Sequence, residues 1–472
     1  QVAPRPKGQP RGRQRSCARA LRARAGYPCM DYFAVGGQSL LSSRLYPSIF
    51  NRSRLHELEA AGQVTQAQAR WVESYSVPEV AVPAPPMPPP AAESYKVPEV
   101  AVPAPPMPPP AATEVTPEDV HMEALDAATA AARAERAEAA EQQPSAPTSL
   151  HKAFHASEVG VWEPCRFAHL RKLQDAARNR GQVHLMRDTV HDRLVAVKQM
   201  PTRWVRHSHT DFVIEHPSET ELPWQDVGCI RFLNSVGYAY GCSLLGVYRD
   251  EQCTYVVSTF ATEGDLFAWC EAGSSPGLAR EAEVRPLARQ LLQGVQQLHD
   301  YSIVHRDLSL ENVLLTRSED GEGLELRIID FSMASTSRRF KHCVRGKASY
   351  QAPEVHTDAE CDAYLSDAFA VGVTLYALLL KDYPWLSTRP GGCKCFEYVR
   401  KHGFRPYLSR RKLRNSTARV GEVMSEPLIH LLEGLLAVNP DDRLTLGERG
   451  WGGARRSVWD EAWLRETGFE GA

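Results

Sequence analysis

The sequence has no long hydrophobic run, no secretory signal pattern and no initiating methionine. Its longest apolar stretch, residues 369–380, is shorter than the ~20 residues of a membrane-spanning helix and is typical of a buried core helix. No basic segment followed by an apolar one marks a secretory leader after Gln1. We therefore expect no transmembrane segment and no secretory address, and the start at Gln1 is consistent with a fragment.

Closely spaced cysteines are also scarce. Among the 11 cysteines, only Cys393 and Cys395 form a close pair, and no second pair stands at a zinc-site spacing. Neither a disulfide framework nor a structural zinc site is indicated. We therefore expect a reducing compartment, the cytoplasm, with the nucleus as the alternative.

An excess of one charge sign is missing too. The chain has 55 Lys and Arg against 57 Asp and Glu, so the whole protein is not expected to bind polyanions. Arginine gathers locally in residues 1–28, which could attract nucleic acid or acidic lipid. We favour a solvated, mostly disordered basic arm over residues 1–72, and we expect nucleic-acid binding through this arm or not at all.

Two biased segments follow the basic arm. Residues 73–112 hold a tandem 20-residue repeat, whose copies differ only at Ser76 and Lys96. Its proline content favours polyproline II and predicts a linker, which could also dock into an SH3- or WW-like partner. Residues 113–149 are rich in Ala and Glu, and Thr116 before a proline predicts the start of an exposed helical tether.

The composition becomes that of a globular domain from about residue 150. Within it, residues 303–315 read IVHRDLSLENVLL, in which two apolar runs flank a polar loop. The spacing of Asp307 and Asn312 lets one loop present a proton acceptor and a metal ligand to the same small volume. This loop is the strongest candidate for an active site.

The HRDLSLEN segment at residues 305–312 resembles the catalytic loop of the protein kinase superfamily. Partner motifs occur in the order found in kinases. They are VAVK at 195–198, IIDFS at 328–332, APE at 352–354, Asp367 and Arg443, which is placed to pair with Glu354. The resemblance covers about three fifths of the chain and indicates a divergent member of the Ser/Thr type.

The resemblance implies an α+β, bilobal protein kinase fold preceded by a largely disordered N-terminal region. The domain would span residues 150–450, with a β-rich N-lobe at about 160–258 and a helical C-lobe at about 262–447. Residues 451–472 would form a C-terminal tail.

The resemblance also assigns roles to the catalytic loop. Asp307 would be the base for the attacking hydroxyl. The preceding Arg306 would bind a phosphate placed on the segment that follows the IIDFS motif. Asn312 and Asp330 would hold magnesium bound to ATP.

A lysine and an acid complete the implied catalytic set. Lys198 would contact the α- and β-phosphates of ATP. Asp226 stands where kinases carry the glutamate that pairs with this lysine, and Glu219 and Glu221 are alternatives.

The implied nucleotide-binding residues come from the glycine-rich loop, a strand, the hinge and the adenine floor. Ser258 would be the small gatekeeper beside them, which predicts an open back pocket. The residues expected to contact ATP are Gly181, Val183, Ala196, Lys198, Thr259, Ala261, Asp265 and Leu314.

Six positions depart from the family pattern. Ala176 and Arg178 replace two glycines, Asp226 replaces a glutamate, Ser309 replaces the catalytic-loop lysine, Ser332 replaces the glycine after Asp-Phe, and Lys347 replaces a threonine. We expect an ATP- and magnesium-dependent kinase that phosphorylates a protein hydroxyl, with Ser or Thr favoured. The alternative is a pseudokinase scaffold that binds nucleotide or partners without phosphotransfer.

Overall fold

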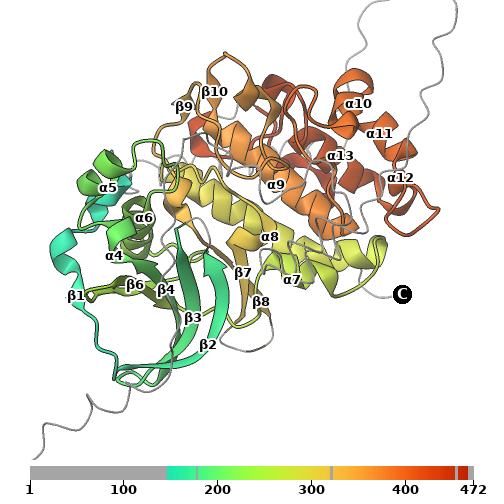
Figure 1. Ribbon diagram of the computed structural model, residues 1–472. Coiled ribbons are helices and arrows are strands. Elements are labelled where there is room, and N and C mark those ends of the chain that lie inside the picture. The colour runs from blue at the N-terminus through green and yellow to red at the C-terminus, as the bar shows by residue number, and fades with distance from the viewer. Residues whose placement is uncertain (1–145, 177–178, 319–320, 322, 452–454, 466–472) are drawn as a thin grey trace, which may run out of the picture. The chain divides into compact units, whose positions relative to one another are not determined.

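The computed structural model describes residues 146–176, 179–318, 321, 323–451 and 455–465. The predicted basic arm and the Pro-rich linker lie outside these residues, as does nearly all of the helical tether. The described residues form a sheet-containing N-lobe and a helical C-lobe, as the kinase resemblance implies (Figure 1).

A six-stranded sheet forms the N-lobe in the order β1-β5-β6-β4-β3-β2 (Figure 1). Neighbouring strands are antiparallel except β1 and β5, which are parallel. The strands are β1 Gly160–Val161, β2 Phe167–Ala176, β3 Gly181–Asp188, β4 Arg193–Pro201, β5 Leu244–Arg249 and β6 Cys253–Thr259.

Strand β4 shows how the sequence positions the site. Side chains alternate between the faces of a strand, and Val195 and Val197 are fully buried in the core beside Phe167. Ala196 and Lys198 are half-buried and point to the opposite face. The VAVK run therefore places its lysine on the face of the sheet that meets the C-lobe.

Helix α6, Pro223–Ser235, packs beside the sheet and begins at Pro223, as its sequence predicts. A Cβ at Gly228 would lie 2.2 Å from the Leu150 carbonyl oxygen, so only glycine allows this contact with the chain before the sheet. Two short helices precede α6, namely α4 Thr202–Val205 and α5 His209–Glu215.

The C-lobe is mainly helical (Figure 1). Its helices are α7 Leu266–Glu271, α8 Leu278–Asp300, α9 Ala363–Leu380, α10 Lys394–His402, α11 Phe404–Arg410, α12 Val420–Val423, α13 Glu426–Leu435 and α14 Ala462–Arg465. Two small antiparallel sheets of two strands accompany them, β7 Val313–Arg317 with β8 Leu324–Ile328, and β9 Arg339–Phe340 with β10 Cys361–Asp362.

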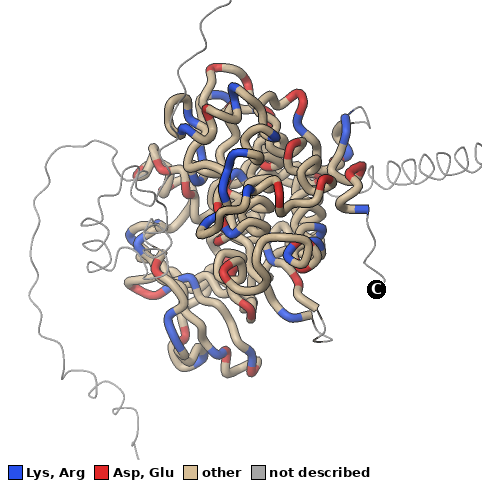
Figure 2. Tube along the Cα trace, turned by 90° about the vertical axis from the view of Figure 1, so that its right-hand side faces the viewer, with Lys and Arg blue, Asp and Glu red and all other residues tan. Residues whose placement is uncertain are grey.

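Helix α9 is long and apolar enough to cross a membrane, but 94% of it is buried inside the protein. Its Gly372 faces Leu435 and Leu436, and a Cβ there would lie 2.9 Å from each of their side chains. The helix is thus the core helix that the apolar run predicts. In the view of Figure 2, positive and negative residues are interspersed along the described chain.

A buried ion pair braces the C-lobe. Arg443 donates to both carboxylate oxygens of Glu354, at 2.6 and 2.9 Å, and to the Leu365 carbonyl oxygen at 2.9 Å. This bidentate pairing confirms the prediction that Arg443 pairs with the glutamate of the APE motif.

Candidate active site

The catalytic loop is held by a carboxylate from the core of the C-lobe. Asp367 of α9 accepts the backbone N–H groups of His305 and Arg306 at 2.7 and 2.9 Å. Arg306 has a positive φ of 67°, a conformation that non-glycine residues rarely adopt. The two hydrogen bonds to Asp367 stabilise this bend, which presents Asp307 at the end of the loop.

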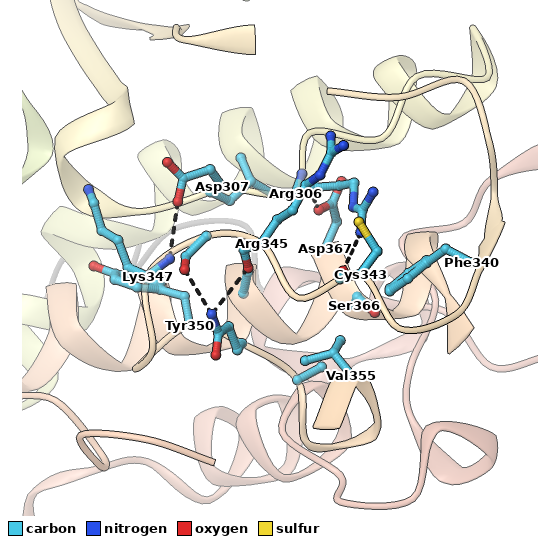
Figure 3. Close-up of a pocket in the computed structure, with 15 residues that line it drawn as sticks. Arg306, Asp307, Phe340, Cys343, Arg345, Lys347, Tyr350, Val355, Ser366 and Asp367 are labelled. Atoms are coloured by element: carbon cyan, nitrogen blue, oxygen red, sulfur yellow. Dashed lines mark hydrogen bonds between the residues drawn. The ribbon is translucent and has the colours of Figure 1, made fainter. Parts of the chain in front are cut away.

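Asp307 and Asn312 lie together, as their spacing predicts. The Asn312 Nδ2 group donates to the Asp307 carbonyl oxygen at 2.8 Å and to its Oδ2 at 3.2 Å. The Lys347 backbone N–H donates to Asp307 Oδ1 at 3.2 Å, the contact drawn between these residues in Figure 3. Both carboxylate oxygens are therefore oriented by hydrogen bonds.

Lys198 lies between two carboxylates contributed by other segments. Its Nζ is 3.2 Å from Asp226 Oδ2 of α6 and 4.0 Å from Asp330 Oδ1. Burial would lower the pKa of Lys198, but Asp330 and Asp226 outweigh burial and raise it. Lys198 is therefore a cation throughout the ordinary pH range, as contact with phosphate requires.

Asp226 also connects the helix to the IIDFS motif. Its Oδ1 accepts the Phe331 backbone N–H at 2.8 Å. Burial raises the pKa of Asp226. Of the two alternatives, Glu219 accepts the backbone N–H groups of Thr220 and Glu221, and the charge of Glu221 helps to raise the pKa of Lys198. The geometry thus favours Asp226 as the acid that pairs with Lys198.

Asn312 and Asp330 lie side by side as possible metal ligands. The Ile329 backbone N–H donates to the Asn312 carbonyl oxygen at 3.0 Å, which brings the two segments together. Burial would raise the pKa of Asp330, but Lys198, the hydrogen bonds from Ser332, and His305 together outweigh burial and lower the pKa. A carboxylate and an amide oxygen fit magnesium, which takes few protein ligands and completes its shell with phosphate and water.

Serine in place of glycine at position 332 causes no backbone strain. Ser332 lies in a 3₁₀ turn, Phe331–Met333, and is not among the described residues with positive φ. Phe331 is buried, and its ring centroid lies 5.2 Å from that of His305. This departure therefore leaves Asp330, the candidate metal ligand, in position.

Several of the expected nucleotide-binding residues are neighbours of Lys198 or of one another. Val183 is the cross-strand neighbour of Lys198, and Ala196 is that of Ser258. Leu314 forms a bridge with Asp265, whose carboxylate also caps α7. These contacts bring β3, β4, β6 and β7 to one region.

Distinct environments surround Thr259 and Ala261 of the expected hinge and Gly181 of the expected glycine-rich loop. The Thr259 N–H donates to the Ser243 carbonyl oxygen at 3.0 Å, so its carbonyl is the group that could contact a base. Ala261 is buried. A Cβ on Gly181 would lie 2.4 Å from the Gln199 carbonyl oxygen, so this glycine permits close packing of β3 on β4.

Ala176 and Arg178 stand where the family pattern has glycines. Ala176 is the cross-strand neighbour of Gly181 at the end of β2. Arg178 lies outside the described residues.

Arg306 lines a pocket between the catalytic loop and the segment after the IIDFS motif, shown in Figure 3. Its guanidinium donates to the Cys343 carbonyl oxygen at 2.7 Å and lies over the Phe340 ring. Burial would raise the pKa of the Cys343 thiol, but Arg306 and Arg345 lower it. Arg306 therefore contacts the segment that follows the IIDFS motif at Cys343.

Sequence reasoning missed the residues that support Asp367. His299 of α8 lies between Asp367 and Glu448, with ring-nitrogen distances of 3.1 and 2.6 Å to their carboxylates. All three side chains are buried. No motif marks His299 or Glu448, because they are 149 residues apart and only the packed fold joins them.

We expect the gatekeeper position to control access to a pocket behind the adenine site. Ser258 is half-buried in the middle of the sheet. Ser258→Met would fill the space beside it, so an ATP-competitive ligand with a bulky aromatic group should bind about 10-fold more weakly. Competition binding measures this change, with ATP itself as the control ligand. Equal affinity for both proteins would mean that neighbouring side chains already close the pocket.

Comparison with known proteins agrees with this geometry. The protein kinase domain model matches residues 179–450, more than half of the chain. The serine/threonine-protein kinase SAPK5 of Oryza sativa subsp. japonica is 35% identical over 199 residues, covering 41% of this chain and 48% of the relative. SRK2F of Arabidopsis thaliana, also a serine/threonine-protein kinase, is 31% identical over 204 residues, covering 41% and 51%.

The chain thus spans about half the length of these curated relatives. The family match extends from the glycine-loop region to the segment that follows Arg443. It includes Lys198, Asp307, Asn312 and Asp330, which the fold brings together. The chain belongs to the protein kinase family.

Proposed function

We propose that this protein transfers the γ-phosphoryl group of ATP to a protein hydroxyl, with Ser or Thr as the acceptor. The observation that carries the proposal is the joint arrangement of Lys198, Asp226 and Asp330 next to the hydrogen-bonded pair Asp307 and Asn312. Phosphoryl transfer depends on positioning and charge neutralisation, and these residues supply both.

Each side chain has a distinct task in the proposed reaction. Lys198 binds the phosphates of ATP, and Asp226 keeps its ammonium in place. Asp330 and Asn312 would hold magnesium, which would neutralise phosphate charge when it is bound. Asp307 orients the acceptor hydroxyl and takes its proton, because its carboxylate is held by Asn312 and the Lys347 backbone.

A serine/threonine acceptor is supported by the relatives, both of which are named serine/threonine-protein kinases.

Further proposals concern the regions outside the domain. The Pro-rich repeats of residues 73–112 would bind an SH3- or WW-like partner, and the protein would act in the cytoplasm.

The second candidate function is that of a pseudokinase scaffold. The observation that favours it is Ser309, which is fully buried where the family pattern has a lysine. A kinase without that charge would stabilise the transferring phosphoryl group less well.

The experiment that separates the two functions measures transfer from labelled ATP with magnesium to a generic protein substrate. We expect Lys198→Met to lower the rate about 100-fold or more, because the phosphates lose their cation. Lys401→Met, which changes an exposed lysine at the end of α10, is the matched control. Acid analysis of the product identifies the acceptor residue.

Wild-type protein that is stabilised thermally by ATP but transfers no phosphate would support the scaffold. Transfer that survives Lys198→Met unchanged would contradict the assignment of this lysine.

A further inference from the structure

Two departures from the family pattern, far apart in the sequence, meet in the structure. The Lys347 Nζ donates to Ser309 Oγ at 2.6 Å and to Glu311 Oε2 at 2.9 Å. Ser309 stands where the family pattern has a lysine, and Lys347 stands where it has a threonine. The lysine and the hydroxyl have therefore exchanged positions between the catalytic loop and the segment that follows the IIDFS motif.

The backbone near Lys347 is fixed against the catalytic loop. Gly346 has φ +79°, and a Cβ there would lie 2.7 Å from the Arg306 carbonyl oxygen and 3.1 Å from Asp307 Oδ1. The Lys347 N–H donates to the same Asp307 oxygen, as Figure 3 shows. Tyr350 adds a second connection, because its hydroxyl oxygen accepts the Leu310 N–H at 3.2 Å.

The ammonium of Lys347 is thus held beside the proposed base by contacts at both ends of the residue. An ammonium has three N–H donors, and Ser309 and Glu311 accept two of them. The side chain is 25% exposed, so part of it is accessible from solvent. We expect an acceptor hydroxyl held by Asp307, and the phosphoryl group that it attacks, to lie near this cation.

We propose that Lys347 is a catalytic residue that supplies, from the other side of the loop, the positive charge absent at position 309. Its ammonium contacts the γ-phosphoryl group during transfer. This inference rests on the proposed kinase function. It explains how a chain with Ser309 can still neutralise charge on the transferring group.

A purely structural role is the competing explanation. In that case the ion pair with Glu311 would hold the segment in place, and loss of either partner would have the same effect. The two roles differ in one respect. A charge that acts on the phosphoryl group is needed in the transition state, so its removal lowers kcat and leaves KM for ATP nearly unchanged.

The test compares kcat, KM for ATP and the thermal midpoint in four variants. We expect Lys347→Met to lower kcat about 100-fold, and Lys347→Arg to recover most of that loss. Glu311→Gln should stay within about three-fold of wild type, because it leaves the cation in place. Lys341→Met, which removes an exposed lysine of the same segment, is the matched control.

A reciprocal exchange provides the sharper test. Lys347→Ser should be as inactive as Lys347→Met, and adding Ser309→Lys to it should raise kcat at least about 10-fold by returning the charge to the loop. A double variant no faster than Lys347→Ser overturns the inference. So does a Lys347→Met protein within about three-fold of wild type, or a Glu311→Gln protein that fails as Lys347→Met does.

These outcomes are distinguishable from failure of the kinase proposal. If wild type and Asp307→Asn are equally inactive on every substrate, the proposed function fails and the role of Lys347 fails with it. If wild type transfers phosphate and Lys347→Met does so equally well, only the role of Lys347 is overturned.

Discussion

Asn in place of Asp307 is expected to lower the rate of phosphoryl transfer by about 10²–10⁴-fold, because the hydroxyl loses its proton acceptor. The substitution keeps the size of the side chain. Asn312 and the Lys347 backbone donate to different oxygens of Asp307, so one of these donors would face an amide nitrogen in the variant. We expect a stability loss of about 1–2 kcal/mol from that mismatch, too small to unfold the domain.

Initial rates with labelled ATP and magnesium measure the effect of Asp307→Asn, together with the thermal midpoint with and without ATP. Asp358→Asn is a suitable control, because that carboxylate is fully exposed. A variant that retains more than one tenth of the wild-type rate would show that Asp307 is not the base. A variant that no longer gains stability from ATP would indicate a role in nucleotide binding instead.

The second large effect is expected at His299, away from the proposed chemistry. His299→Ala leaves the carboxylates of Asp367 and Glu448 buried without their shared cation. Removal of one partner from a buried charge network costs about 3–5 kcal/mol. Because Asp367 also holds His305 and Arg306, we expect weaker anchoring of the catalytic loop as well as a lower free energy of unfolding.

The contribution of His299 to the free energy of unfolding should depend on pH. Burial alone would lower the pKa of His299, but hydrogen bonds to Asp367 and Glu448 raise it to about 9. A histidine whose pKa is higher in the folded state stabilises the fold fully below the unfolded pKa of about 6.5. This contribution is lost as the pH rises through about 9, and it amounts to about 3 kcal/mol.

Denaturant unfolding of wild type and His299→Ala at pH values from 6.5 to 10 measures this contribution. The difference in unfolding free energy between the two proteins should shrink as the pH rises. His402→Ala, which removes an exposed histidine at the end of α10, is the control. A difference that stays constant over this range would mean that His299 is neutral in the folded protein.

Several site residues could be predicted because their signals are local. The VAVK run specifies a strand whose alternate side chains are buried, which orients Lys198. Pro223 marks the start of α6, and that start places Asp226 in its first turn. The spacing of Asp307 and Asn312 within one loop determines that they can meet.

The choice of Asp226 over Glu219 and Glu221 needed the tertiary structure. All three acids lie within eight residues, and the direction of α6 relative to β4 decides which one reaches Lys198. The same holds for the contact of Arg306 with Cys343, which depends on the path of the intervening segment.

The sequence by itself determined the kinase family, the order of its elements and the residues of the catalytic loop, because these depend on short-range patterns. It also revealed Ser309 and Lys347 as two separate departures. Only the tertiary structure decided that they touch, since 38 residues separate them and the bend at Gly346 brings their side chains together. Contacts of this kind arise from packing between distant segments, which no local periodicity or motif encodes.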